Sequence, residues 1–394
     1  TTYWVYYRRF KIRKMIFDTI TIACCAIVLI LAIISIHSNA LFRKLHETES
    51  QEEGEMPKLS VIITAHDAAK ELEDNLSAIL SQVYSPGYEV IVVNAASTDD
   101  TEEVLKRFKS INDNLYTTFT PDSSRYMSRK KLAVTLGVKA AKNEWVVLIE
   151  ANCRPDSDHW LEAIGKRCTK NNNLVLGYSN FEKGKSFFRK FIYMENMFRQ
   201  HQIMREASKG TAYCAGTNNI AFRRSDFMNH NGYASNLRFL RGEYDFIIND
   251  LAEERRTAVI TEPDVKLTEQ LPSLKKWRNN HLYYMETRKH LQRSFSHRIT
   301  YNIDTTLQII NYLVEISLIG ASILYARWII TIAACFALLL TISLRTFYGI
   351  KVAKNFNERA SIFLIVPFEI SSIICKLVYM IRYMMADKMN FIRK

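Results

Sequence analysis

Long apolar runs lie near both ends of the chain, and a segment of mixed polarity lies between them. Residues Thr19–Ile36 read TITIACCAIVLILAIISI, a run without a charge that nearly matches the hydrocarbon core of a bilayer at about 1.5 Å per residue. A cleaved signal peptide would have a shorter apolar run and a small-residue cleavage site after it. Two more runs, Thr305–Ala326 and Trp328–Leu344, are separated by Arg327 and predict a tight hairpin of membrane helices.

A fourth apolar stretch, Ser361–Ile381, is interrupted by Pro367, Glu369 and Lys376. Glu369 and Lys376 are seven positions apart, so they share one helical face, which also carries Ser372. This pattern predicts a third C-terminal helix that either spans the membrane or lies at its interface.

The pattern divides the chain into five parts. These are a basic N-terminal segment with a membrane helix, an acidic linker, one large domain, a membrane hairpin and a last helix, at residues 1–45, 46–57, 58–298, 305–344 and 361–381. The domain is long enough for a substantial hydrophobic core.

The first half of the domain alternates apolar strands with amphipathic helices. We predict strands at Leu59–Thr64, Tyr88–Asn94, Leu115–Phe119 and Glu144–Glu150, with helices near residues 72–83, 97–108 and 130–141 between them. Such alternation predicts a parallel sheet covered by helices, with ligands bound beyond the carboxyl ends of the strands. No G-x-G-x-x-G or G-x-x-x-x-G-K-[ST] motif follows a strand, which argues against dinucleotide-binding and P-loop proteins.

Several motifs resemble, in their order, those of the family 2 glycosyltransferases. The opening reads SVIITAHDAAKELEDNLSAILSQVYSPGYEVIVVNAASTDDT, and LIEANCRPDSDHW is similar to the strand end that carries the metal-binding D-x-D motif. Further motifs are GTNNIAFRRSDF, GEYDFIIND and the Trp-containing helix at residues 275–284. The resemblance covers residues 58–298 and implies a GT-A-type, Rossmann-like α/β domain that binds a nucleotide sugar and is flanked by transmembrane helices.

The resemblance also implies a mechanism and a set of site residues. A divalent cation, Mg²⁺ or Mn²⁺, would neutralise the diphosphate, and an Asp would deprotonate the acceptor hydroxyl during inverting transfer. The positions that match the nucleotide-sugar contacts are Thr64, His66, Asn94, Ala95, Lys130, Lys131 and Glu150. Those on the acceptor side are Asn219 and Trp277.

Several positions depart from the family pattern, among them Asn280 and Tyr283 after Trp277, where Gln and Arg usually stand. Three departures concern the nucleotide, the metal and the base. Ala95 stands where an Asp would bind the uracil ring, and Asn152 stands where a metal-binding Asp is expected, two residues after Glu150. Tyr244 occupies the position of the catalytic base between Glu243 and Asp245. With an ordinary pKa of about 10, a tyrosine is a poor proton acceptor near neutrality. We therefore expect a weakened cation site at Glu150 and Asn152, or no cofactor at all.

The retained residues also have structural interpretations. Thr64 could form a strand-terminal hydrogen bond, Lys130 and Lys131 could be a solvated helix start, and Glu150 could be an ordinary strand-end carboxylate. Asp245 could cap its helix or pair with Arg241.

The positive charge of the chain lies next to the apolar runs. The net charge is +13, and residues 1–14, 275–298, 345–359 and 382–394 together carry +17. This distribution suits anionic lipid head groups and gives no support to nucleic acid binding. The seven cysteines have no zinc-binding spacing, which is consistent with a reduced compartment.

Two hypotheses of different classes remain. The first is a membrane-anchored glycosyltransferase that acts on a lipid-linked or polysaccharide acceptor. The alternative is a catalytically inactive relative that serves as a scaffold or subunit of an envelope complex. In either case we expect an integral protein of a bacterial inner membrane with its main domain in the cytoplasm. The expected partners are membrane lipids, a nucleotide sugar and other membrane proteins.

Overall fold

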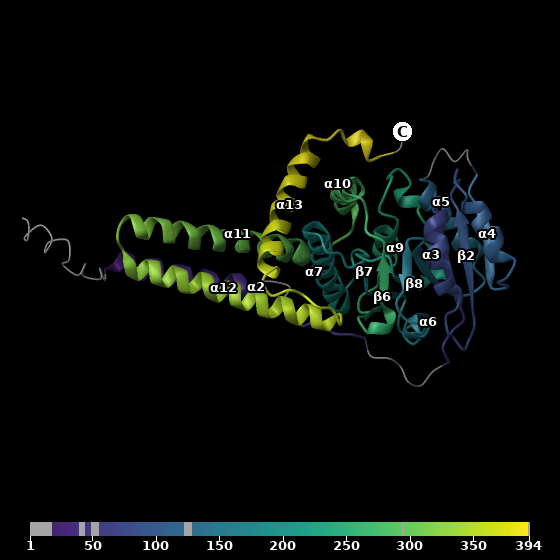
Figure 1. Ribbon diagram of the computed structural model, residues 1–394, viewed down its shortest axis with the longest axis horizontal. Helices are drawn as coiled ribbons and strands as arrows, with labels where there is room; N and C mark the ends of the chain where they lie inside the picture. The colour runs from purple at the N-terminus through teal and green to yellow at the C-terminus, as the bar shows by residue number, and fades with distance from the viewer. Residues whose placement is uncertain (1–17, 39–43, 49–54, 122–127, 294, 393–394) are drawn as a thin grey trace, which may run out of the picture. The chain divides into compact units, whose positions relative to one another are not determined.

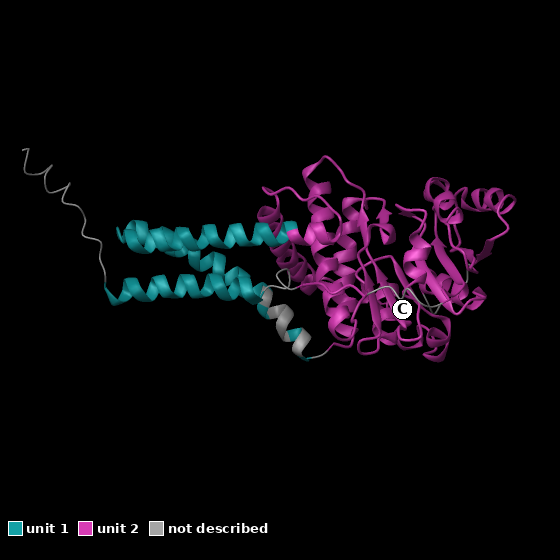
Figure 2. Cartoon of the chain, turned by 90° about the horizontal axis from the view of Figure 1, so that it is seen from below, with its two compact units in different colours: residues 1–43, 294–350 teal, residues 44–293, 351–394 magenta. Residues whose placement is uncertain are grey.

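A computed structural model of the chain describes residues 18–38, 44–48, 55–121, 128–293 and 295–392. The predicted basic segment before residue 18 and residues 49–54 of the predicted linker lie outside these ranges. The chain forms two compact units, coloured separately in Figure 2. Residues 1–43 and 294–350 belong to unit 1, and residues 44–293 and 351–394 belong to unit 2.

Unit 1 consists of three long apolar helices. They are α2 (Thr19–Ser38), α11 (Phe295–Leu324) and α12 (Trp328–Asn355), although the last turn of α12 belongs to unit 2. Among the described residues, Thr19–Ser38, Thr305–Leu324 and Trp328–Asn355 are long and apolar enough to cross a membrane.

The three helices of unit 1 pack through small residues and several polar contacts. Ala32 of α2 meets Ala334 and Ala337 of α12 in a core where the short side chains let the helices approach closely. At one end of the unit, Arg327 donates to Asp18 at 2.9 Å. Toward the other end, the buried Arg345 donates to Ser35 Oγ at 3.0 Å.

The first half of unit 2 has the predicted βαβαβαβ order (Figure 1). The strands are β1 (Leu59–Ala65), β2 (Tyr88–Asn94), β3 (Leu115–Phe119) and β4 (Trp145–Glu150). The helices between them are α3 (Ala69–Leu80), α4 (Thr101–Lys109) and α5 (Arg129–Ala140). These four strands are parallel in the order β3-β2-β1-β4, which confirms the predicted fold class.

The second half of unit 2 makes the sheet mixed. Strand β8 (Ile220–Arg223) pairs antiparallel with both β4 and β6 (Leu174–Gly177), and β9 (Thr257–Ile260) closes the seven-stranded sheet. A small second sheet has the order β5-β10-β7, formed by Cys153–Pro155, Leu267–Glu269 and Ser179–Phe181. The remaining helices in this region are α6 (Trp160–Gly165), α7 (Phe187–Lys209), α8 (Arg224–Asn229) and α9 (Glu243–Leu251).

The predicted last helix is α13 (Ile365–Met385), and it belongs to unit 2. It packs on α7 and on α10 (Leu274–His290), as Figure 1 shows. The residues before it are anchored in the same unit, because the Phe356 ring stacks on Tyr178 with ring centroids 4.1 Å apart. The domain is therefore completed by a segment that follows the membrane hairpin in the sequence.

Candidate functional site

The carboxyl ends of β1, β2 and β4 bring together three of the predicted site residues. The parallel register pairs Thr64 with Glu150 on one side and with Val93 on the other. Asn94 is the next residue of β2 and pairs with Ala65. Because ligands of open α/β sheets bind at this edge, Thr64, Asn94 and Glu150 define the candidate site.

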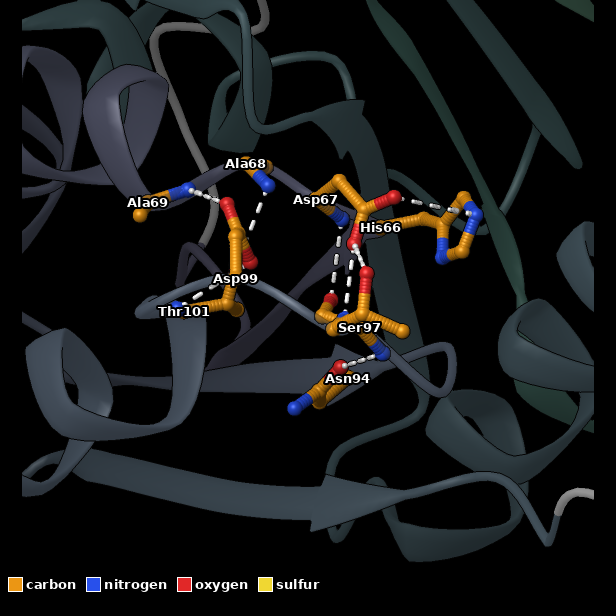
Figure 3. Close-up of polar contacts among 9 residues, drawn as sticks. His66, Asp67, Ala68, Ala69, Asn94, Ser97, Asp99 and Thr101 are labelled. Atoms are coloured by element: carbon orange, nitrogen blue, oxygen red, sulfur yellow. Dashed lines mark hydrogen bonds and ion pairs between the residues drawn. The ribbon is translucent and has the colours of Figure 1, made fainter.

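The loops after β1 and β2 are joined by hydrogen bonds (Figure 3). Asp67 Oδ1 accepts from the Thr98 backbone N–H at 2.8 Å, and Ser97 Oγ accepts from the Asp67 backbone N–H at 2.9 Å. The hydrogen bond from Thr98 lowers the pKa of Asp67. Asp67 has a φ of 45°, a left-handed conformation that Asp adopts more readily than most residues. The half-exposed His66 lies 3.7 Å from the Asp67 carboxylate.

A second group of contacts holds the start of α4 against the same loops. Asp99 Oδ2 accepts from the Ala69 backbone N–H, and Thr101 Oγ1 accepts from the Ala68 backbone N–H, both at 3.0 Å (Figure 3). Asp67 after β1 and Asp99 after β2 therefore connect the two loops.

The two predicted nucleoside-binding residues at the end of β2, Asn94 and Ala95, form hydrogen bonds within the protein. Asn94 Oδ1 accepts from the Ser97 backbone N–H at 3.0 Å. Ala95 is only 3% exposed, and its backbone N–H donates to Ala65 at 2.7 Å. The roles of Asn94 and Ala95 in binding a nucleoside stay predictions.

At the end of β4, the Glu150 carboxylate forms an ion pair with Lys130. The Lys130 ammonium, from the first turn of α5, lies 2.5 Å from Glu150 Oε1, and both side chains are about one-fifth exposed. The same ammonium lies 5.0 Å from the centroid of the Tyr244 ring. Three predicted site residues from β4, α5 and α9 thus form one cluster.

Both members of this ion pair are held in their charged forms. Burial alone would lower the pKa of Lys130, but attraction by Glu150 and Glu243 raises it overall. Burial alone would raise the pKa of Glu150, but Lys130, Lys276 and Arg241 lower it overall. The motifs alone did not identify Lys276 and Arg241 as site residues, although Lys276 lies within the Trp-containing helix and Arg241 directly precedes GEYDFIIND.

Lys131 does not share the environment of Lys130. It is fully buried, and its ammonium donates to the backbone oxygen of Asn236 at 2.5 Å and to Asn236 Oδ1 at 3.1 Å. Burial lowers the pKa of Lys131 to about 8. In this structure its ammonium binds inside the domain rather than at the site.

The start of α9 places Tyr244 at the cluster, whereas Asp245 forms a hydrogen bond with the backbone elsewhere in the domain. Gly242 has a φ of 92°, and an added Cβ would come within 2.6 Å of Thr287, so only glycine fits this entry to the helix. Tyr244 is 7% exposed, and its hydroxyl has no hydrogen-bond partner among the described residues. Asp245 Oδ1 accepts from the Ala215 backbone N–H at 3.0 Å.

The pKa directions at this helix disfavour a proton acceptor at residue 244. Burial, followed by the nearby Glu150 charge, raises the pKa of Tyr244 well above its ordinary value. Burial also raises the pKa of Asp245, although its bond from Ala215 acts in the opposite direction. Glu243 is 4% exposed, and its Oε1 has no hydrogen-bond partner in the described part of the chain.

The residues at the predicted metal position do not fit a divalent cation. Glu150, the one carboxylate there, is bound by the Lys130 ammonium. Asn152 supplies only neutral oxygens, and its backbone oxygen accepts from the Gln270 N–H at 3.0 Å. The residues that the structure describes contain no group of three or more His, Cys, Asp or Glu side chains placed to hold a metal. Hard cations prefer several charged oxygen ligands, which this position lacks.

The two predicted acceptor-side residues are buried in the domain. Asn219 Nδ2 donates to Val265 at 2.7 Å, and its Oδ1 accepts from Trp160 at 3.2 Å. Trp277 is 6% exposed and packs against aromatic rings of α7, α10 and α13, which belong to Phe188, Phe191, His281 and Tyr379. The acceptor-side roles of Asn219 and Trp277 stay predictions.

A cavity of about 560 Å³ lies beside the segment that follows β4. Its lining residues are Asp74, Asn75, Arg154, Asp156, Glu182, Thr268 and Gln270. Two of them contact this segment, because Asn75 Nδ2 donates to the Ala151 backbone oxygen at 2.9 Å and the Gln270 N–H donates to that of Asn152 at 3.0 Å. Glu150, Lys130 and Tyr244 do not line the cavity.

Comparisons with known proteins agree with the arrangement of the domain. Residues 60–229 match the model of the family described as glycosyl transferase family 2. The chain is 29% identical over 109 residues to the glycosyltransferase AglE of Haloferax volcanii, which is 27% of this chain and 34% of AglE. It is 28% identical over 100 residues to the poly-beta-1,6-N-acetyl-D-glucosamine synthase of Staphylococcus epidermidis, which is 25% of this chain and 23% of the synthase.

A solved structure shares the fold. The mannosyltransferase PcManGT from Pyrobaculum calidifontis, in complex with GDP-Man and Mn²⁺, superposes with a TM-score of 0.50 over 86% of this chain and 98% of its own. The two sequences are 17% identical. The sequence matches, in contrast, span only about a third of AglE and a quarter of the synthase.

Proposed function

We propose that this chain, whose residues 60–229 match the model of glycosyl transferase family 2, is a membrane-anchored glycosyltransferase-like protein whose domain no longer transfers sugar. It acts instead as a scaffold or subunit of a membrane-bound envelope complex. The domain faces the cytoplasm of a bacterial cell, where nucleotide sugars are made, and the three apolar helices hold the protein in the inner membrane.

One observation carries this proposal: the base position holds Tyr244. Inverting transfer needs a group that takes the proton of the acceptor hydroxyl, and loss of a general base typically costs about 10²- to 10⁴-fold in rate. Burial raises the pKa of Tyr244, so the phenol keeps its proton near neutrality. The adjacent Asp245 is bound to the backbone of residue 215, which keeps it from taking over.

The end of β4 supports the same conclusion. The family resemblance places a metal-binding carboxylate at residue 152, where this chain has Asn152. The ion pair with Lys130 engages the remaining carboxylate, Glu150. The departures at residues 152 and 244 thus affect both the leaving diphosphate and the acceptor hydroxyl.

A second candidate function is sugar transfer with Glu243 as the base. Glu243 is buried next to Tyr244, and one of its carboxylate oxygens has no hydrogen-bond partner among the described residues. Such an oxygen is free to accept a proton from a bound hydroxyl.

The test is a turnover assay on the full-length protein in lipid nanodiscs. UDP- and GDP-sugars are added with and without Mn²⁺, in the presence of host membranes as acceptor, and released UDP or GDP is measured. We expect no release above that of empty nanodiscs. Release that disappears in Glu243→Gln would establish the second candidate and overturn the proposal.

A double variant tests whether the two altered positions cause the loss. Asn152→Asp combined with Tyr244→Asp should yield Mn²⁺-dependent release. The matched control places the same changes on the exposed surface, as Asn171→Asp with Tyr116→Asp, and should stay inactive. A thermal unfolding measurement establishes whether the double variant is folded. If it is folded and still inactive, residues 152 and 244 do not account for the loss of sugar transfer.

A further inference from the structure

The metal position of the candidate site already contains a cation that belongs to the chain. We propose that the site binds the diphosphate of a nucleoside diphosphate without a divalent cation, with the Lys130 ammonium as the built-in counter-charge. This inference goes beyond the proposed function, because a domain that no longer transfers sugar would still bind the ligand class of the family that it resembles.

The position of Lys130 supports this role. It is the second residue of α5, whose N-cap residue, Ser128, accepts a hydrogen bond from the Lys131 backbone N–H. The positive end of the helix macrodipole therefore adds to the charge of the ammonium. Lys130 also keeps about a fifth of its side chain exposed, so a ligand can reach it.

Two other cationic side chains interact electrostatically with Glu150. Lys276, from α10, and Arg241, which precedes α9, both lower the pKa of Glu150. Glu243 is the second carboxylate that acts on Lys130. Glu269 also interacts with Glu150, and the like charge of Glu150 helps to raise the pKa of Glu269. Three cations and three carboxylates thus act on this region, so an anion gains most by replacing Glu150 as the partner of Lys130.

The ion pair also explains why a metal ion would be excluded. A divalent cation bound to Glu150 would lie beside an ammonium that is only 2.5 Å from the carboxylate, and the two positive charges would repel each other. Lys130 can instead exchange one anionic partner for another. When a diphosphate binds, its oxygens replace Glu150 as the partner of Lys130, with no change in the number of cations.

Tyr244 supplies a donor beside this ammonium. Its ring lies 5.0 Å from the Lys130 ammonium. Its hydroxyl is buried and has no hydrogen-bond partner among the described residues. A phosphate or sugar oxygen bound at Lys130 would satisfy this hydroxyl, which otherwise carries the energetic cost of an unpaired buried donor.

Glu150 and the ligand compete for Lys130, and this competition gives a test. Metal-free and metal-dependent binding predict opposite changes in nucleotide affinity for the Glu150→Gln variant. Without metal, the Glu150 carboxylate opposes binding, so Glu150→Gln should tighten it. In a metal-dependent site the same carboxylate is a ligand of the cation, so Glu150→Gln should weaken binding. The Lys130→Met variant should bind about tenfold or more weakly, as expected for loss of a charge-assisted hydrogen bond.

The experiment is calorimetric titration of the full-length protein in detergent with UDP and with GDP, in EDTA and in MnCl₂. We expect at least one nucleotide to bind in EDTA, with no more than about a twofold change on adding Mn²⁺ and about fivefold tighter binding by Glu150→Gln. Lys130→Arg should retain binding, and Lys139→Met is the matched control on the exposed far end of the same helix.

Three results would overturn the inference. They are binding that requires Mn²⁺, weaker binding by a folded Glu150→Gln variant, and no binding of either nucleotide in either buffer. The last result would leave the proposed loss of sugar transfer intact. Conversely, sugar transfer in the turnover assay would overturn the proposed function and leave metal-free binding standing.

Discussion

Lys130 and Lys131 are adjacent in the chain, yet their side chains lie in different environments. Lys130 pairs with Glu150 at the candidate site. The Lys131 ammonium donates to Asn236 and lies near the rings of Tyr233, Phe239 and Phe246, 4.8 to 6.0 Å from their centroids. Successive helical residues point about 100° apart. Lys131 is directed into the domain by Asn236, which is 105 residues further along the chain. The local sequence therefore could not predict which of the two lysines lies at the site.

The burial of Lys131 predicts a pH dependence of stability. Its pKa falls from 10.5 to about 8 on folding, so the unfolded chain binds more protons between those values and stability rises with pH across that window. The full-length protein in detergent should gain about 2 kcal/mol between pH 7.5 and 9.5 from this group.

Thermal unfolding at both pH values measures this effect. The same measurement on Lys131→Met removes the contribution of this group and serves as the reference. Equal pH dependence in the two proteins would show that Lys131 does not carry the effect.

Helix α13 has two apolar faces at the scale of a secondary-structure element. One face carries Phe368, Ile373 and Tyr379 and is buried against α7 and α10. The other exposes Ile370, Ile374, Leu377 and Ile381. The sequence allowed a membrane span or an interfacial helix at residues 361–381, because length and polarity fit both. The choice depends on the surfaces of α7 and α10, which the α13 sequence does not contain.

The exposed face of α13 predicts contact with lipid. In liposomes that contain a photoactivatable phospholipid, the full-length protein should become crosslinked at Ile370, Ile374, Leu377 or Ile381, as well as in the three apolar helices. Apolar side chains at a bilayer interface gain from burial among the acyl chains. Peptide mapping by mass spectrometry identifies the sites, and the peptide with the exposed Asp113 is the internal control. Labelling confined to the three apolar helices would contradict the predicted contact of α13 with lipid.

At the scale of the whole molecule, the sequence predicted the first half of the domain better than the second. Strands β1 to β4 are five to seven residues long and alternate with helices, so hydrophobic periodicity identifies them. Strands β5 to β10 have three or four residues each, and β8 lies between β4 and β6 rather than beside its neighbours in sequence. Short strands that pair with partners distant in the sequence leave no local hydrophobic pattern from which they could be predicted. The motif resemblance was the main guide to this half.

The segment that returns from the hairpin is fixed to the domain by a buried carboxylate. Glu358, with 1% of its side chain exposed, pairs with Lys183 and Lys266 at 2.9 Å each. Glu358→Gln keeps the shape but removes the charge that both lysines face. We expect a loss of about 3 kcal/mol in stability, as for other broken buried ion pairs.

The measurement is again thermal unfolding of the full-length protein. Glu254→Gln, at an exposed carboxylate 3.9 Å from Arg255, is the matched control and should not change the melting temperature. A melting temperature of Glu358→Gln equal to that of the control would refute the anchoring role of Glu358.

The domain is interrupted in the sequence between residues 293 and 351, and this has a consequence for its biosynthesis. After α2, a ribosome makes residues 44–293, then the two helices of the hairpin, and last the segment that contains Phe356 and α13. Until that segment emerges, Tyr178 lacks its stacking partner and Trp277 lacks Tyr379. The domain can therefore reach its final packing only after the hairpin has been synthesised, which couples the end of folding to membrane insertion.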